Sequence, residues 1–147
     1  IWLARGLAGG GRLITIEPES EHVDFARRAF DKAGVGDRVE IRRGTGLEVL
    51  PALLVELGPG SVDLVFIDAI KTETAGYFQT ARELLRPGGL AVIDNALGGG
   101  DWWIDQPEGT HASRDAIDAF NRALAVDDAF EACCVPIREG VAIARKK

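Results

Sequence analysis

The chain has 147 residues, of which 46% are hydrophobic and 27% are charged, with a formal net charge of −6 and a pI near 4.9. This length and composition suit one globular domain, residues 1–147, with a sizeable core. The acidic balance argues against nucleic acid, which binds clustered Lys and Arg, and no apolar run reaches the roughly 20 residues needed to cross a bilayer.

Along the chain, apolar patterns typical of strands alternate with apolar patterns typical of helices. Ile1–Leu7 has the spacing of a helix already under way and does not begin with Met, so we expect the sequence to lack the N-terminal portion of its domain. Strands and helices are then expected to alternate, with a turn at residues 86–89. The expected strands are residues 12–17, 37–43, 64–67 and 90–94, and the expected helices are residues 21–33, 47–57, 75–85 and 113–126.

The last two apolar runs break this alternation. Residues 130–136 and 141–144 are separated by only four residues, which is too short for a crossover helix, so they should form an antiparallel hairpin. The fold class predicted is α/β, a doubly wound and mostly parallel sheet that ends in this hairpin. Cys133 and Cys134 lie inside the hairpin and are too few for a disulfide framework or a cysteine zinc site. We expect them to be buried strand residues in a cytoplasmic protein.

Oxygen-bearing side chains follow two neighbouring strands. The Leu-Val-Phe-Ile run at residues 64–67 is typical of a strand buried on both faces, and it ends at Asp68. The strand at residues 90–94 ends in Asp94, followed by Asn95. Parallel strands bring their carboxyl ends to one edge, and three hard oxygen donors there would suit Mg²⁺ or Ca²⁺. The alternative is that Asp94 and Asn95 turn the chain and that Asp68 caps the next helix.

Lys71 lies three residues after Asp68, within reach of the same edge. A lysine beside a metal can act as a general base, although most lysines after a strand are solvated surface charges. Trp102 and Trp103 stand in a glycine-rich segment, where large aromatic side chains suggest a wall over a flat apolar ligand. Packing of that segment onto its own domain is the competing explanation.

Two earlier strand ends are candidates for holding a nucleoside. Glu17 ends the strand at residues 12–17, where an acid can accept both hydroxyls of a ribose. It could equally be a solvated acid at the start of the next helix. Gly44 and Thr45 end the following strand, where a small residue allows a flat ring to approach the backbone. Thr45 is just as suitable as the N-cap of the next helix.

With these residues placed, the chain resembles the metal-dependent O-methyltransferases of the catechol and caffeoyl-CoA type, in particular their small bacterial members, over nearly its whole length. The resemblance is carried by residues 65–71, 84–89, 93–95, 136–137 and 140–146. It implies a Rossmann-like, class I methyltransferase fold that uses S-adenosylmethionine. Residue by residue it implies Asp68, Asp94 and Asn95 as ligands of Mg²⁺, Ca²⁺ or Mn²⁺, Lys71 as the catalytic base, and Glu17, Gly44, Thr45 and Asp68 as cofactor contacts.

The family pattern also implies a reaction and a partner. The expected reaction is methyl transfer to one hydroxyl of a catechol-like, vicinal-diol aromatic molecule, in a homodimer without nucleic acid or membrane partners. Ile70 stands where the family has Asp, and Thr72–Thr74 lack its usual tyrosine, which affects the expected substrate contacts. Two alternatives stay open, a nicotinamide-dependent oxidoreductase and an inactive nucleoside-binding relic.

Overall fold

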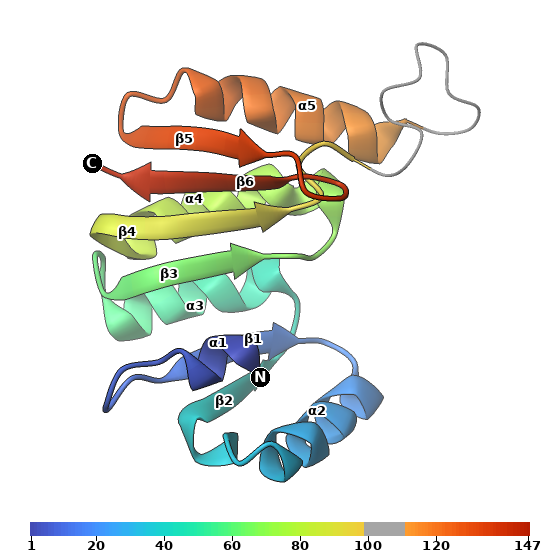
Figure 1. Cartoon of the computed structure of the whole chain (residues 1–147), viewed down its shortest axis with the longest axis vertical. Coiled ribbons are helices and arrows are strands. Elements are labelled where there is room, and N and C mark those ends of the chain that lie inside the picture. Colours follow the sequence, from blue (N-terminus) through green and yellow to red (C-terminus); the bar gives the residue numbers. More distant parts are fainter. Residues whose placement is uncertain (99–110) are drawn as a thin grey trace. The chain divides into compact units, whose positions relative to one another are not determined.

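A computed structural model describes residues 1–98 and 111–147. Trp102 and Trp103 lie outside the described residues, so their role as a ligand wall stays a prediction. The elements are α1 (Trp2–Arg5), β1 (Leu13–Glu17), α2 (Ser20–Lys32), η1 (Gly36–Arg38), β2 (Val39–Arg43), α3 (Gly46–Leu57), β3 (Val62–Ile67), η2 (Lys71–Glu73), α4 (Thr74–Leu84), β4 (Leu85–Asp94), α5 (Ala112–Ala125), β5 (Phe130–Val135) and β6 (Val141–Lys146). The alternation of strands and helices is confirmed (Figure 1).

Two element boundaries differ from those expected. Gly36–Arg38 form a short 3₁₀ helix, so the second strand begins at Val39 rather than at residue 37. The predicted turn at residues 86–89 belongs to β4, which starts at Leu85 and pairs with Val62 before the register shifts between Val62 and Leu64. An irregularity in the ladder therefore accommodates the Pro-Gly-Gly sequence that suggested a turn.

The chain divides into two compact units, Ile1–Val49 and Leu50–Lys147. In the first unit β1 and β2 form a parallel pair in which Glu17 is the partner of Arg43. Helix α2 packs against both strands. It ends at Lys32, and Gly34, two residues later, has a φ of 67°, the left-handed conformation expected after a helix. The arrangement of a single domain stays a prediction.

The second unit contains the hydrophobic core. Its four strands have the order β3-β4-β6-β5, with β3 parallel to β4 and β6 antiparallel to both β4 and β5. The terminal antiparallel hairpin is therefore confirmed. Helix α4 lies behind these strands in Figure 1 and packs against β3, β4 and α5. The core includes aromatic rings from α4, α5 and β5, and small or β-branched strand residues: Phe78, Phe120, Phe130, Ala91, Ile93, Ala142 and Ala144.

Two predictions about burial are wrong. The strand β3 is not buried on both faces, because Leu64 and Phe66 are 38% and 48% exposed while Ile67 is buried. Successive side chains of a strand point to opposite faces, and only the face with Ile67 packs into the core. Cys133 and Cys134 are exposed rather than buried. They lie on β5, which among the described residues is the last strand of its sheet and pairs with β6 alone.

Candidate active site

The carboxyl ends of β3 and β4 lie side by side in the second unit. Ile67 and Ile93 are partners in the parallel ladder, so Asp68 and Asp94 each follow directly after a paired residue. Both elements form because apolar, β-branched residues fill the core behind them, and each run stops at its aspartate. The expectation that the two strands carry Asp68 and Asp94 to one edge of the sheet therefore holds in the backbone.

Lys71 connects the two strand ends. Its Nζ donates to Oδ1 of Asp68 over 3.0 Å and to the backbone carbonyl of Asp94 over 3.4 Å. The Lys71 side chain is 18% exposed, whereas that of Asp68 is 49% exposed. The amine is thus partly enclosed and lies at the edge where the sequence predicted chemistry. A surface lysine pointing into solvent would make neither contact.

Asp94 and Asn95 also turn the chain, as the structural alternative predicted. The backbone N–H of Asn95 donates to Oδ1 of Asp94 over 2.9 Å, and Asn95 has a φ of 56°. Asparagine tolerates this left-handed region better than most residues. The turn does not exclude a ligand role, since a carboxylate has two oxygens and the Asn95 amide can still accept or donate. The alternative for Asp68 is not seen, because neither η2 nor α4 has a side-chain hydrogen bond at its N-cap.

Several residues that hold this turn were missed from the sequence. Asn121 of α5 donates its side-chain N–H to the carbonyl of Ala96 over 2.6 Å, and the Ala96 N–H donates to the carbonyl of Gly140 over 2.9 Å. Gly140 has a φ of 81°, and a Cβ there would lie 2.8 Å from Cβ of Leu97. Only glycine fits such a position without a shift. The terminal hairpin therefore supports the segment that follows Asp94.

Tyr77 was also missed, although it is the single tyrosine of the chain. It lies on α4, is 4% exposed, and donates its hydroxyl to Oε2 of Glu73 over 2.5 Å. Burial, followed by the hydrogen bond and negative charge of Glu73, raises the pKa of Tyr77 to about 12. The i to i+4 spacing of Glu73 and Tyr77 on one helical face was the available signal.

In the first unit, Glu17, Gly44 and Thr45 lie at the ends of β1 and β2. Oε1 of Glu17 accepts the backbone N–H of Glu19 over 2.9 Å and lies 3.3 Å from Nδ1 of His22. Gly44 has a φ of 136°, and a Cβ there would lie 2.9 Å from a methyl group of Val49. The N–H of Gly44 donates to the Glu17 carbonyl over 3.4 Å, so these strand ends are adjacent.

Thr45 makes the contacts of a helix start. Its backbone N–H and its hydroxyl both donate to Oε2 of Glu48, over 3.0 and 2.7 Å, and its carbonyl accepts the N–H groups of Glu48 and Val49. The backbone hydrogen bond from Thr45, and then the one from its side chain, lower the pKa of Glu48. The capping alternative is thus seen for Thr45, and a helix-start contact is seen for Glu17. Their roles toward a cofactor stay predictions.

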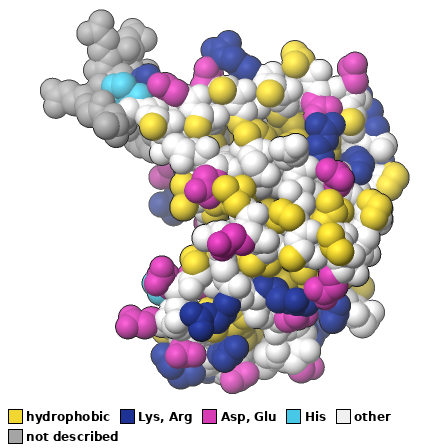
Figure 2. All heavy atoms as spheres, turned by 180° about the vertical axis from the view of Figure 1, so that it is seen from behind, with side chains coloured by type: hydrophobic (Ala, Val, Ile, Leu, Met, Phe, Trp, Pro, Cys, Tyr) yellow, Lys and Arg dark blue, Asp and Glu magenta, His cyan; other side chains and the backbone are white. Residues whose placement is uncertain are grey.

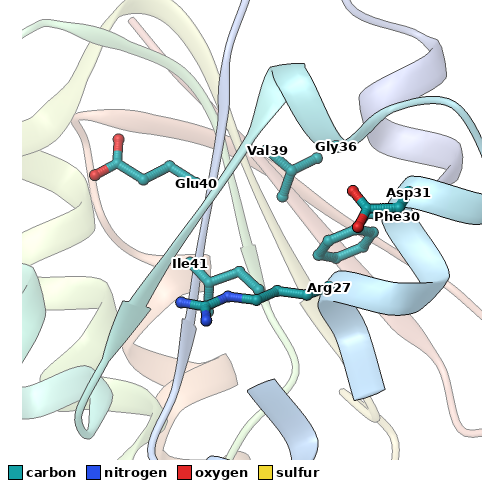
Figure 3. A pocket seen from close by; sticks show the side chains of 7 residues that line it. All are labelled: Arg27, Phe30, Asp31, Gly36, Val39, Glu40 and Ile41. Atoms are coloured by element: carbon teal, nitrogen blue, oxygen red, sulfur yellow. The ribbon is translucent and has the colours of Figure 1, made fainter. Parts of the chain in front are cut away.

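A cavity of about 340 Å³ lies in the first unit between α2 and β2 (Figure 3). Arg27, Phe30 and Asp31 contribute from α2, and Val39 and Ile41 from β2. Glu40 points away from the other labelled side chains. None of the predicted site residues lines this cavity. On the face drawn in Figure 2, Lys and Arg side chains are mixed with Asp and Glu over the described residues.

The donor chemistry at the β3 and β4 ends fits a hard divalent cation. Two carboxylates and an amide oxygen are ligands that Mg²⁺, Ca²⁺ and Mn²⁺ accept. Among residues 1–98 and 111–147 no group of three or more His, Cys, Asp or Glu side chains has metal-binding geometry. The set Asp68, Asp94 and Asn95 contains only two such side chains, so it stays a prediction based on donor type and strand register.

Adjacent parallel strand ends, helices between the strands and a terminal antiparallel hairpin define a Rossmann-like α/β protein. The model of a family described as "O-methyltransferase" matches residues 1–147. The chain belongs to this O-methyltransferase family. It is 39% identical over 132 residues to the catechol O-methyltransferase of Niastella koreensis, covering 90% of this chain and 58% of that protein. It is 34% identical over 148 residues to caffeoyl-CoA O-methyltransferase 2 of Zea mays, covering 97% of this chain and 56% of that protein.

A solved structure shows the same fold. The O-methyltransferase TomG from Streptomyces achromogenes, in complex with SAM, superposes with a TM-score of 0.85 at 34% identity. The match covers 99% of this chain and 66% of that one. The chain thus spans somewhat more than half the length of the relatives it matches. None of the helices in its described part is long and apolar enough to cross a membrane.

Proposed function

We propose that the protein transfers the methyl group of S-adenosylmethionine to one hydroxyl of a vicinal-diol aromatic molecule, with help from a divalent cation. The observation that carries the proposal is the position of the Lys71 amine, which contacts both the Asp68 carboxylate and the Asp94 carbonyl at two adjacent strand ends. Membership of the O-methyltransferase family supports the methyl donor and argues against the nicotinamide-dependent alternative.

Each residue then has a defined task. Asp68, Asp94 and Asn95 would hold the cation, with Mg²⁺ the first candidate. The cation would supply a Lewis acid that stabilises the phenolate form of the substrate. The substrate hydroxyl gives its proton to Nζ of Lys71, which lies beside Asp68. The carboxylate of Asp68, which already accepts a hydrogen bond from Nζ, would stabilise the ammonium group that results.

The remaining site residues would bind the methyl donor. Glu17 would accept the ribose hydroxyls, and the backbone at Gly44 and Thr45 would border the adenine, with Asp68 a further contact. The requirement for glycine at Gly44 supports close approach of a flat ring, because this strand end has no Cβ. A small aromatic substrate, a homodimer and a cytoplasmic location belong to the same proposal.

Calorimetry with S-adenosylhomocysteine, with and without Mg²⁺, tests the proposal together with turnover on catechol. Binding of the nucleoside and Mg²⁺-dependent methylation are expected. Asp94→Asn should lower Mg²⁺-dependent turnover by about 10² to 10³, since loss of several kcal/mol of charge stabilisation corresponds to that factor.

Asp63→Asn is the matched control, because Asp63 lies at the start of β3, where it pairs with Arg86 at 2.6 Å. Its turnover should stay close to that of the unmodified protein. Absence of S-adenosylhomocysteine binding would refute the methyltransferase proposal. Binding without turnover on any catechol or caffeoyl thioester would instead indicate an inactive, nucleoside-binding relative.

A further inference from the structure

The proposed base lies on a segment with little hydrogen bonding of its own. Lys71 begins η2, a three-residue 3₁₀ helix in which the N–H of Glu73 donates to the carbonyl of Ile70 over 3.0 Å. Short 3₁₀ segments have poorer hydrogen-bond geometry than α-helices. The long, flexible side chain of Lys71 therefore needs a backbone that is fixed by other contacts if its amine is to stay at one place.

Tyr77 supplies such a contact from the helix that follows. Its hydroxyl donates to Oε2 of Glu73, which is the last residue of η2 and lies two residues after Lys71. A buried residue of α4 is thus connected to the end of the segment that carries the proposed base.

The hydrogen bond between Tyr77 and Glu73 lies among packed helices. Tyr77 is 4% exposed on the core side of α4, and α5 packs against η2. A tyrosine hydroxyl is protonated in neutral solution, so that of Tyr77 keeps donating to Glu73. A hydrogen bond from a hydroxyl to a carboxylate is charge-assisted and is among the stronger ones in proteins.

We propose that Tyr77 is a positioning residue for catalysis, which fixes η2 through Glu73 and so holds the Lys71 amine between the ends of β3 and β4. The inference rests on the proposed function, in which Lys71 takes the substrate proton. Without the hydroxyl, η2 gains alternative backbone conformations, and the amine spends less time at 3.0 Å from Asp68. Small displacements of a reacting group are known to lower rates steeply.

Tyr77→Phe tests this, because it removes one oxygen atom and keeps the ring in the core. We expect kcat to fall by about tenfold or more, the usual effect of losing a residue that orients a functional group, with little change in KM for S-adenosylmethionine. Phe78→Leu is the matched control on the same helix. Its ring packs against Phe120 and Phe130 in the core, so the variant should lower the melting temperature and leave kcat nearly unchanged.

Two variants of Glu73 complete the experiment. Glu73→Gln keeps an oxygen that accepts the Tyr77 hydroxyl and should retain most of kcat. Glu73→Ala should lower kcat as much as Tyr77→Phe does. The double variant Glu73→Ala with Tyr77→Phe should have a kcat no lower than that of either single variant, because both substitutions remove the same hydrogen bond. Equal losses of kcat in Tyr77→Phe and Phe78→Leu would overturn the inference, as would unchanged kcat in Tyr77→Phe.

A readout without catalysis separates this inference from the proposed function. Amide hydrogen exchange of the peptide that contains residues 69–74 should be faster in Tyr77→Phe than in Phe78→Leu. If the unmodified protein methylates catechol but Tyr77→Phe matches it in both kcat and exchange, only the positioning role fails. If no variant has turnover, the proposed function fails, and unchanged exchange in Tyr77→Phe would still refute the positioning role.

Discussion

The strand ends of the two units carry similar polar residues but use them differently. In the second unit, Lys71 reaches from its own segment to the end of the neighbouring strand, where it contacts the Asp94 carbonyl. In the first unit, Glu17 and Thr45 direct their side chains to groups two and three residues away. The hydrogen bonds of Glu17 and Thr45 stay within their own segment and stabilise a helix start. The hydrogen bonds of Lys71 join two strand ends and so bring two segments into one candidate site.

The same contrast appears in two pairs of a hydroxyl and a glutamate. Tyr77, which is buried on α4, donates to Glu73 at the end of η2, and the pKa of Tyr77 rises to about 12. Thr45 donates to Glu48 at an exposed helix start, and the pKa of Glu48 is lowered. Tyr77 is buried and Thr45 is exposed, so the first hydrogen bond is better shielded from water than the second.

Replacement of Lys71 should have the largest effect on turnover, because Lys71 is the side chain that reaches the neighbouring strand end. Lys71→Met keeps the length of the side chain but removes the amine. We expect kcat for catechol methylation to fall by about 10² to 10⁴, the range for loss of a general base. Binding of S-adenosylhomocysteine should change little, because Lys71 is not among the proposed contacts of the nucleoside. Steady-state kinetics and calorimetry measure the two quantities.

Lys146 offers the control for that variant. Its Nζ donates to the carbonyls of Arg82 and Leu85, over 2.6 and 2.8 Å, so it is also a partly buried lysine with two oxygen partners. Lys146→Met should destabilise the fold without lowering kcat per folded molecule. If Lys71→Met keeps more than about a tenth of the original kcat, far above the range for a lost base, Lys71 is not the base.

The burial of Tyr77 and its hydrogen bond to Glu73 should make the free energy of unfolding depend on pH in the alkaline range. The pKa of Tyr77 is about 12 in the folded protein and 10.0 when unperturbed. Between these values the unfolded chain has lost the phenol proton while the folded one retains it, so the free energy of unfolding falls as pH rises. The contribution, about 2 to 3 kcal/mol, is fully present below pH 10 and lost by about pH 12.

Urea unfolding of the protein and of Tyr77→Phe across this range isolates the effect, since every other group titrates in both. The protein has a single tyrosine, so ultraviolet absorbance of tyrosinate reports Tyr77 alone. A folded-state titration near pH 10 would show that the hydroxyl is neither buried nor paired. The Tyr77–Glu73 pair would then be as exposed as the Thr45–Glu48 pair.

The sequence predicted the elements well because their patterns are local. Apolar runs ending in Asp68 and Asp94 marked β3 and β4, and a four-residue connection marked the β5–β6 hairpin. The burial of β3 and of the cysteines was predicted wrongly for a common reason. An apolar strand does not reveal whether a second layer covers it, or whether it lies at the edge of its sheet.

At the site, the positions of Asp68 and Asp94 followed from strand register, but their supports did not. Asn121 contacts Ala96 across 25 residues, and the close approach of Gly140 to Leu97 depends on how the hairpin folds back. Such contacts between segments distant in sequence cannot be predicted from the local pattern of either segment. The Glu73–Tyr77 pair is local, yet its importance depends on burial that the sequence shows only as a helical face.

The smallest predicted effect concerns Glu17 and decides whether the first unit contains more than helix starts. Glu17→Gln keeps an oxygen that can accept the Glu19 N–H, so the contact at the start of α2 is retained. Loss of the carboxylate charge should weaken hydrogen bonds to ribose hydroxyls and raise the Kd for S-adenosylhomocysteine by about tenfold, equivalent to about 1.4 kcal/mol. Glu19→Gln, at the N-cap of α2, is the control and should bind as the unmodified protein does. An unchanged Kd in Glu17→Gln would leave Glu17 as a helix-start residue, because a carboxylate that bound the nucleoside could not lose its charge without weakening that binding.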